Sequence, residues 1–242
     1  MKRQPVSAAA SWGNVRRCDL SPIAYPVAMA SAPNSLTRNE RISLAHAFAE
    51  AGEKQATLCQ GWNTKDLLVH LIVRERRPDA AAGIVLPFLK PWREKVEREL
   101  ASGTYEELIE TFKSGPGSFS PFAIPGVDNV ANLIEFVIHH EDVRRAQPNW
   151  QPRTETAELQ LEIKRRLPRF SMLALRRSPV GVVMLDGTGQ QIWLKRGNTT
   201  VELHGEPIEV LLYLSGRQQH AQVSLHGSPA AIATFERVKF GF

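Results

Sequence analysis

The chain has 242 residues, and its hydrophobic fraction of 43% and charged fraction of 23% are those of ordinary globular proteins. This length can form one large domain or two smaller ones, and no apolar run approaches the roughly 18 residues that a membrane-spanning helix needs. Two cysteines do not indicate a disulfide framework, which favours a reducing compartment, so we expect a cytoplasmic protein that does not bind membranes.

The formal net charge of +5 is unevenly distributed along the chain. Most of it lies in residues 1–34, where four basic residues accompany a single acidic one, whereas in the remainder Lys and Arg are interleaved with Glu and Asp. An interleaved pattern is typical of a solvated surface and not of a phosphate-binding face, so nucleic-acid binding is not predicted.

Residues 1–34 are rich in proline and small residues, and we predict a disordered extension there. The stretch SPIAYPVAMASA ends like a signal peptide, but two prolines interrupt it and it lies far from the basic start, so secretion is not predicted. Met29 precedes the first predicted helix, which leaves Met1 and Met29 as alternative starts.

The first two helices are predicted from their end signals. Thr37 and Glu40 have the spacing of a capping box, which predicts a helix over about residues 38–51. Asn63 or Thr64 caps a second helix, which is expected to end near Pro78 because the residue before a proline disfavours helical backbone.

Four further helices and one irregular segment are predicted before residue 178. Pro91 begins a third helix, and a second capping box at residues 104–107 begins a fourth. Residues 114–126 contain too much Gly and Pro for regular structure. Asp128 caps the next helix, and a last helical stretch over about residues 155–176 contains Pro168, which is expected to kink or divide it.

Beyond Ser178 the chain consists of short β-branched runs between Gly-containing turns, which predicts an antiparallel meander. LHGEP at Leu203–Pro207 and LHGSP at Leu225–Pro229 predict a repeated unit, in which a strand ends at His, turns at Gly and leads into a helix that begins with Pro. The predicted fold is a mainly α helical bundle over residues 35–177 followed by a small α+β domain over residues 178–242.

The stretch EFVIHHEDVRRA over Glu135–Ala146 contains the strongest candidate site. On a helix, Glu135 and His139 lie about 40° apart and one turn along, so a carboxylate and an imidazole can reach the same ion. Asp142 falls on the same side, whereas His140 is rotated by about 100° from His139 and should pack elsewhere. A solvent-exposed polar face would give the same pattern, so this helix alone leaves both interpretations open.

A third metal ligand has to come from another segment, and His70 is the candidate. Its helix is apolar nearly all round, and His70 lies on the only polar stripe, with Asp66, Arg74 and Arg77. Such a helix should be buried between neighbours, which places this stripe either at a cleft or at the one wet edge.

Two stretches, LCQGWNTKDLLVHLIVRERRPDAAAGI and NLIEFVIHHEDVRRAQP, resemble the actinobacterial branch of the mycothiol-dependent maleylpyruvate isomerase family, within the wider class of DinB-like four-helix metalloproteins. The specific parts are C-x-G-W-x-x-x-D-L-x-x-H over Cys59–His70 and E-x-x-x-H-x-x-D-x-x-R over Glu135–Arg145. The resemblance runs from about Asn39 to the C-terminus. It implies a DinB-like four-helix bundle followed by a small α+β, sterol-carrier-like C-terminal domain.

In that family a divalent metal, typically zinc, is held by a histidine of the second helix and by a Glu and a His one turn apart on a later helix. The resemblance places these ligands at His70, Glu135 and His139, with Asp142 as a supporting group that orients His139 or a bound water. Two imidazoles and one carboxylate leave a coordination position open, as in catalytic zinc sites. A zinc-bound thiol is held as its thiolate, which gives a low-molecular-weight thiol such as mycothiol a route to activation.

The isomerases of this family add a thiolate to a double bond, allow rotation about the resulting single bond and then eliminate the thiol, and the enolate formed needs a cation. Arg217 is the candidate catalytic residue for this role or for binding a substrate carboxylate; the alternative is an ordinary surface arginine. Arg74 and Arg144 are candidates for binding anionic groups of the cofactor, and the alternative for them is ion pairing with Glu75 or Glu141.

The stretches RERRPDAAAGI and HHEDVRRAQP are nearest to an uncharacterised metal-binding subgroup, so the resemblance implies the metal site but not the maleylpyruvate substrate. The sequence therefore favours a divalent-metal-binding, thiol-dependent isomerase or S-transferase that acts on a small electrophile. The alternative is a non-catalytic protein that binds a metal or a small ligand. The expected partners are a small-molecule substrate and a low-molecular-weight thiol, and a monomer and a homodimer both stay open.

Overall fold

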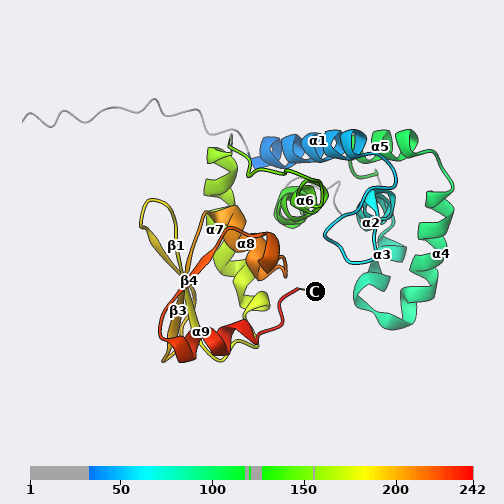
Figure 1. Cartoon of the computed structure of the whole chain (residues 1–242). Helices are drawn as coiled ribbons and strands as arrows, with labels where there is room; N and C mark the ends of the chain where they lie inside the picture. Colours follow the sequence, from blue (N-terminus) through cyan, green and yellow to red (C-terminus); the bar gives the residue numbers. More distant parts are fainter. Residues whose placement is uncertain (1–32, 118–119, 121–126, 155, 242) are drawn as a thin grey trace, which may run out of the picture. The chain divides into compact units, whose positions relative to one another are not determined.

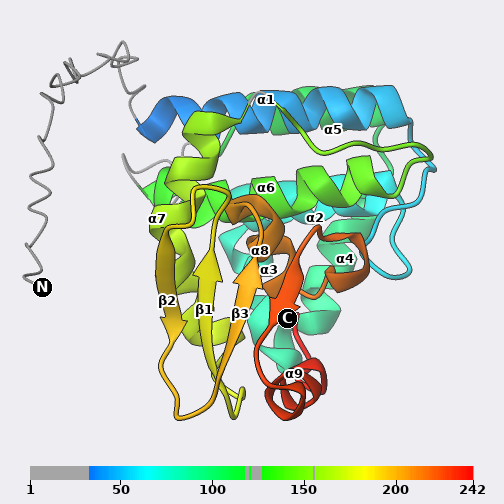
Figure 2. The same ribbon diagram turned by 60° about the vertical axis from the view of Figure 1, so that its left-hand side comes forward.

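The computed structural model (Figures 1 and 2) describes residues 33–117, 120, 127–154 and 156–241. Residues 1–32 of the predicted extension and much of the stretch over 114–126 lie outside the described residues. The described elements are α1 (Pro33–Ala51), α2 (Thr64–Arg76), α3 (Pro78–Val85), η1 (Pro87–Leu89), α4 (Lys90–Ala101), α5 (Tyr105–Lys113), α6 (Val127–Arg145), α7 (Ala157–Ala174), β1 (Gly181–Leu185), β2 (Gln191–Lys195), β3 (Thr200–His204), α8 (Pro207–Leu214), η3 (Gln218–His220), β4 (Ser224–His226) and α9 (Pro229–Glu236).

The helices α1, α2, α5 and α6 share one hydrophobic core, to which α3 and α4 add a residue or two at the edge. Three buried phenylalanines lie at its centre: the Phe112 ring is 6.3 Å from that of Phe48 and 5.4 Å from that of Phe136, edge-on to both. Edge-to-face contacts suit the charge distribution of aromatic rings and add to the gain from burial. This core fixes the spacing of α2 and α6, the two helices that carry the motif histidines.

Two of the predicted helix starts are confirmed. The Asn63 side chain accepts a hydrogen bond from the backbone of Asp66, whose carboxylate accepts one in return, so α2 begins with a capping box. Thr104 and Glu107 form the same reciprocal pair at the start of α5. Both caps satisfy backbone N–H groups that the first turn of a helix leaves without partners.

The predicted start of the first helix is wrong. The helix α1 begins at Pro33, so Thr37 lies inside it and does not cap it. Glu40 is buried and accepts hydrogen bonds from His140 Nδ1 at 2.9 Å and from Arg153 Nη1 at 2.9 and 3.0 Å. A spacing typical of a capping box therefore serves a tertiary contact between α1, α6 and the segment that precedes α7.

We expect Glu40→Gln to weaken the acid dependence of stability. Burial raises the pKa of Glu40, but the hydrogen bond with His140 and the charge of Arg153 lower it further, to about 2. Because this folded-state pKa lies below the ordinary 4.5, the contribution is complete above about pH 4.5 and is lost as the pH falls towards 2. Urea unfolding at neutral pH and at about pH 3 should show a smaller loss of unfolding free energy in Glu40→Gln than in wild type.

The control for this measurement is Glu50→Gln, an exposed position on the same helix. It should lose as much unfolding free energy on acidification as the wild type does. Equal losses in all three proteins would show that the Glu40 contacts do not contribute to acid sensitivity.

The helix α3 was not predicted. The predicted end of the second helix near Pro78 is confirmed, since α2 ends at Arg76, but Pro78 then begins α3 at once. Proline is tolerated in the first turn of a helix because the missing N–H has no intrahelical partner there. The sequence pattern marked the end of one helix correctly and did not show the start of the next.

Residues 157–174 form the single helix α7, so Pro168 does not divide it.

The strands form one sheet of order β2-β1-β3-β4, and the predicted antiparallel meander is wrong (Figure 2). The strand β1 pairs with β2 antiparallel but with β3 parallel, and β3 pairs with β4 antiparallel. After the β1–β2 hairpin, the chain passes the start of β1 to reach its other edge. Because β1 is then central, its apolar run VVM is buried, whereas β2 at the edge alternates between exposed and buried residues.

Two glycines explain the crossing. A Cβ atom on Gly181 would lie 2.8 Å from the backbone nitrogen of Gly197, and one on Gly197 would lie 2.4 Å from that of Gly181. No side chain fits at such distances, so the connection from β2 to β3 can pass the start of β1 only with glycine at both positions. The predicted meander would place Gly197 in a hairpin turn, and this expectation is wrong.

A second hydrophobic core lies between the sheet and the helices α7, α8 and α9, and α6 contributes Leu133, Val137 and Ile138 to it. The helix α7 packs on β2 and α8, although it precedes the predicted domain boundary near residue 178. The repeated unit is confirmed, since β3 ends at His204 before α8 and β4 ends at His226 before α9. The described residues fall within one compact unit, Ser31–Phe242.

A buried ion pair joins α6 to α8. Arg145 exposes 1% of its side chain; its Nε donates to Glu141 at 2.6 Å and its Nη2 donates to Glu209 at 2.6 Å. Since Glu209 lies on α8, this contact orients the C-terminal segment against the motif helix.

Among the described helices, none has the length and hydrophobicity that crossing a bilayer would require.

Candidate functional site

One face of α6 presents Glu135, His139 and Asp142. His139 lies between the two carboxylates: its Nδ1 is 2.9 Å from Asp142 Oδ2, and its Nε2 is 3.5 Å from Glu135 Oε2. This follows from helical spacing, since residues three and four apart share a face. If Nδ1–H donates to Asp142, the lone pair of Nε2 is free on the Glu135 side, which is the arrangement that supports histidine ligands of metals.

His70 reaches the same place from α2. Its ring centroid lies 5.8 Å from that of His139, at an interplanar angle of 77°, and on its other side it is 5.0 Å from Trp62. Two imidazoles that share a tetrahedral zinc at about 2 Å would have centroids roughly 5 Å apart, so the observed separation is compatible with a shared ion. The Nδ1 atom of His70 is buried and has no hydrogen-bond partner within the described parts of the chain.

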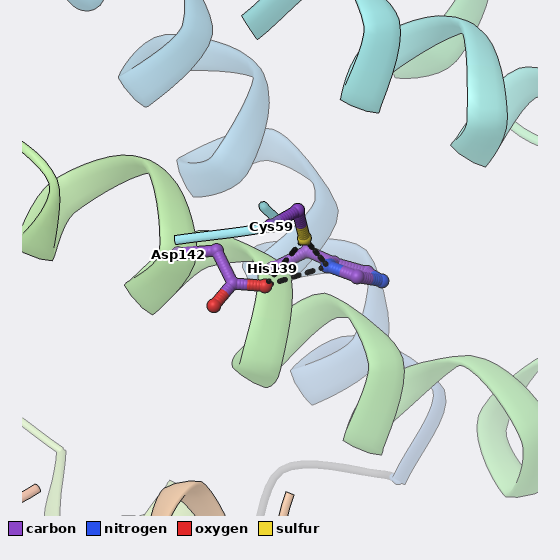
Figure 3. A group of neighbouring side chains, drawn as sticks. All are labelled: Cys59, His139 and Asp142. Atoms are coloured by element: carbon purple, nitrogen blue, oxygen red, sulfur yellow. Dashed lines mark hydrogen bonds and ion pairs between the residues drawn. The ribbon is translucent and has the colours of Figure 1, made fainter. Parts of the chain in front are cut away.

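Cys59 joins the site from the loop between α1 and α2 (Figure 3). Its Sγ lies 3.2 Å from Asp142 Oδ2 and 3.8 Å from His139 Nδ1. The loop is held by local bonds, because Thr57 Oγ1 accepts from the Cys59 backbone and donates to the carbonyl of Trp62. The Leu58 backbone N–H donates to the carbonyl of Asp142 at 3.1 Å, which fixes the loop on α6.

Arg217 reaches the site from the C-terminal segment. The helix α8 ends in a Schellman motif: Gly216 has φ +94°, its N–H donates to the carbonyl of Tyr213, and that of Arg217 donates to the carbonyl of Leu212. The guanidinium then donates from Nε and Nη2 to the two oxygens of Asp142, at 2.8 and 2.6 Å. Nη1 donates to the carbonyl of Ser215 at 2.5 Å.

The surroundings of Arg217 differ from those of a surface arginine. It exposes 18% of its side chain, and its partner Asp142 is fully buried. Its Nη2 also lies 3.5 Å from Cys59 Sγ. A cation from the C-terminal segment is thus placed beside the thiol and beside the carboxylate that orients His139.

The electrostatics of the site favour a positive charge at His139. Burial opposes protonation of this imidazole, but hydrogen bonds with Asp142, Cys59 and Glu135 raise its pKa well above the ordinary value. Burial raises the pKa of the Glu135 and Asp142 carboxyl groups. The hydrogen bond with His139 lowers both, and Arg74 beside Glu135 and Arg217 beside Asp142 add to this, so that each pKa falls to about 2. A metal ion can supply the same positive charge and would displace a proton on binding.

His70 has the opposite bias. Burial lowers its pKa to about 3, and the positive charge of His139 adds to this effect. The imidazole of His70 is therefore neutral at physiological pH. A neutral, buried ring with an unpartnered nitrogen is suited to act as a metal ligand.

Two donor sets overlap at His139. Donor atoms of Cys59, His139 and Asp142 lie within 4.8 Å of one another. Figure 3 shows the three side chains pointing toward one another. However, both oxygens of Asp142 accept from Arg217, and a divalent cation there would face the guanidinium charge at close range. On the opposite side of His139, Glu135 and His70 face a more distant cation, since the Nε of Arg74 lies 3.9 Å from Glu135 Oε2.

The structure also places the other predicted site residues. Arg74 donates to Asn132 and its Nε lies 3.9 Å from Glu135 Oε2, so it borders the site. Arg144 pairs with Glu141 at 3.1 Å and lines a cavity on another side of α6. His140 points away from His139 and pairs with Glu40, in agreement with the helical geometry.

The residue that the sequence interpretation missed is Cys59. It stands first in the motif C-x-G-W-x-x-x-D-L-x-x-H, but the count of cysteines by itself bears only on the redox compartment. The signal was available in the motif, whereas the approach of the loop to Asp142 follows only from the tertiary structure.

The fold is similar to that of two solved structures. One is a mycothiol-dependent maleylpyruvate isomerase carrying a histidine-to-alanine mutation, with a TM-score of 0.55 and 12% identity. The other is a mycothiol-dependent maleylpyruvate isomerase without a named mutation, with a TM-score of 0.50 and 13% identity. Each alignment covers 81% of this chain and 92% of the other. No protein-family model and no curated protein sequence matches the chain.

Proposed function

We propose that this chain binds a divalent metal ion through His70, Glu135 and His139, and that it is a thiol-dependent isomerase or S-transferase for a small electrophile. The observation that carries the proposal is the convergence of two imidazoles and an ionised carboxylate, with one buried imidazole nitrogen left without a partner. The shared fold with a mycothiol-dependent isomerase supports the choice of a small thiol as cofactor. Zinc is the proposed metal and mycothiol the proposed thiol.

A bound divalent metal would supply a positive charge that favours the thiolate form of a small thiol at neutral pH. The protein's own groups prepare the site for it. Asp142 holds the ring of His139 through Nδ1, and Arg217 holds Asp142 through two hydrogen bonds. Arg74, beside Glu135, is the proposed cation for an anionic group of a bound molecule.

The chemistry assigned to Arg217 is charge stabilisation. When a thiolate adds to a double bond conjugated with a carbonyl group, the carbonyl oxygen gains negative charge as an enolate. A preorganised cation in a partly buried site stabilises this charge without further reorganisation. Arg217 is held by Asp142 and by the Ser215 carbonyl. Its Nη2 lies 3.5 Å from Cys59 Sγ, which shows that the space beside this guanidinium can hold a sulfur atom.

The proposal is tested by loading the Cys59→Ala protein with cobalt(II) and adding N-acetylcysteine as a thiol probe, with N-acetylserine as the matched alcohol. We expect a thiolate-to-cobalt charge-transfer band with the thiol alone. Stoichiometric metal without a response to the thiol would favour a non-catalytic metal- or ligand-binding protein. A protein that takes up no metal would overturn the proposed site.

A further inference from the structure

A cavity lies on a different face of α6 from His139. It has a volume of about 560 Å³ and is bounded by α1, by His140 and Arg144 of α6, and by the segment that leads into α7. This size accommodates a small molecule. The candidate metal ligands do not line it, because consecutive residues on a helix point about 100° apart.

The wall of this cavity contains an arginine with unused hydrogen-bonding capacity. Arg153 Nη1 donates to both oxygens of Glu40, and its Nε lies 2.6 Å from Glu141 Oε1. Its Nε and Nη2 are buried and, among the described residues, neither makes a hydrogen bond, although Nε keeps its ion-pair contact with Glu141. A buried donor left without an acceptor costs about 1–3 kcal/mol, so an arriving acceptor would gain from pairing with it.

The neighbouring wall residues add further donors. Arg144 contributes a second guanidinium, which is partly engaged by Glu141 and by the carbonyl of Gln151. Ser43 of α1 and Thr154 contribute hydroxyl groups to the same cavity. Glu40 already accepts hydrogen bonds from His140 and Arg153. Glu158 is the other carboxylate of the lining, so the two guanidinium groups and the hydroxyl groups are the donors that a ligand would meet.

We propose that this cavity is a binding site for a small carboxylate, whose oxygens accept from Arg153 Nη2 and from the hydroxyl groups of Ser43 and Thr154. A carboxylate fits better than a phosphate, because the charge of Arg153 is already paired with Glu40 and Glu141 and leaves little for a dianion. Charge-assisted bonds of this kind are short and roughly twice as strong as neutral ones. The site is separate from the proposed metal centre and does not depend on it.

The test titrates the full-length protein with L-malate, L-glutamate and inorganic phosphate, followed by calorimetry and ligand-observed NMR. Ser43→Trp should fill the cavity from an exposed position of α1 and leave the buried ion pairs intact. Ala49→Trp is the matched control, exposed on the same helix outside the cavity. Arg153→Gln removes the free donor, with circular dichroism to verify folding.

We expect saturable binding of at least one carboxylate to wild type, to Ala49→Trp and to His70→Ala. Binding should be at least about tenfold weaker in Ser43→Trp, which fills the cavity, and in Arg153→Gln, which loses roughly one charge-assisted bond. Retention in His70→Ala distinguishes this cavity from the metal centre. Binding that is unchanged in Ser43→Trp, binding of phosphate alone, or no binding of either carboxylate would overturn the proposal.

Discussion

Replacing His70 or Glu135 with alanine is expected to remove the divalent metal from the purified protein, whereas Cys59→Ala is expected to leave it bound. Each of the first two variants removes one of three proposed ligands. The loss should exceed the roughly 10- to 100-fold fall in affinity that follows the removal of a supporting hydrogen bond. Metal content by elemental analysis and affinity by competition with a chromogenic chelator measure the effect.

Cys59→Ala is the variant that separates the two donor sets at His139. If the metal were held by Cys59, His139 and Asp142, this variant would lose it and His70→Ala would not. The geometry predicts the reverse, because Asp142 is already paired with Arg217 and the His70 nitrogen is unpartnered. Equal metal content in wild type, His70→Ala and Glu135→Ala would end the proposed site.

Arg217→Ala is expected to destabilise the protein by about 3 kcal/mol, far more than the loss of a surface arginine. The substitution leaves the carboxylate of Asp142 without its guanidinium partner in a fully buried position. Removing one partner of a buried pair costs more than the pair contributes, since the buried carboxylate keeps only its contacts with His139 and Cys59. Chemical denaturation of metal-free protein measures this loss without a contribution from metal binding.

The double variant Arg217→Ala/Asp142→Asn provides the control. It removes both charges, so it should recover part of the stability that Arg217→Ala loses, and the resulting mutant cycle isolates the coupling energy. A loss of less than about 1 kcal/mol of unfolding free energy in Arg217→Ala would show that this residue contributes no more than an exposed ion pair does. If metal content is kept while the thiol-dependent activity is lost, the role of Arg217 lies in the chemistry and not in metal binding.

The fold could be predicted from the sequence where the signals are local. Capping boxes at Asn63 and Thr104 mark real helix starts, and the two LHG turns end strands before helices. The predictions failed where a local signal served a distant partner. Glu40 resembles a capping residue but binds Arg153, and Gly197 resembles a turn residue but allows the chain to cross β1.

The candidate site shows the same division. Helical periodicity by itself determined that Glu135 and His139 share a face and that His140 does not, because the angle per residue is a property of the backbone. That Cys59 and Arg217 lie against Asp142, and that His70 lies across from His139, was decided only by the tertiary structure. Contacts between residues far apart in sequence depend on how whole helices and loops pack, and no local pattern encodes that packing.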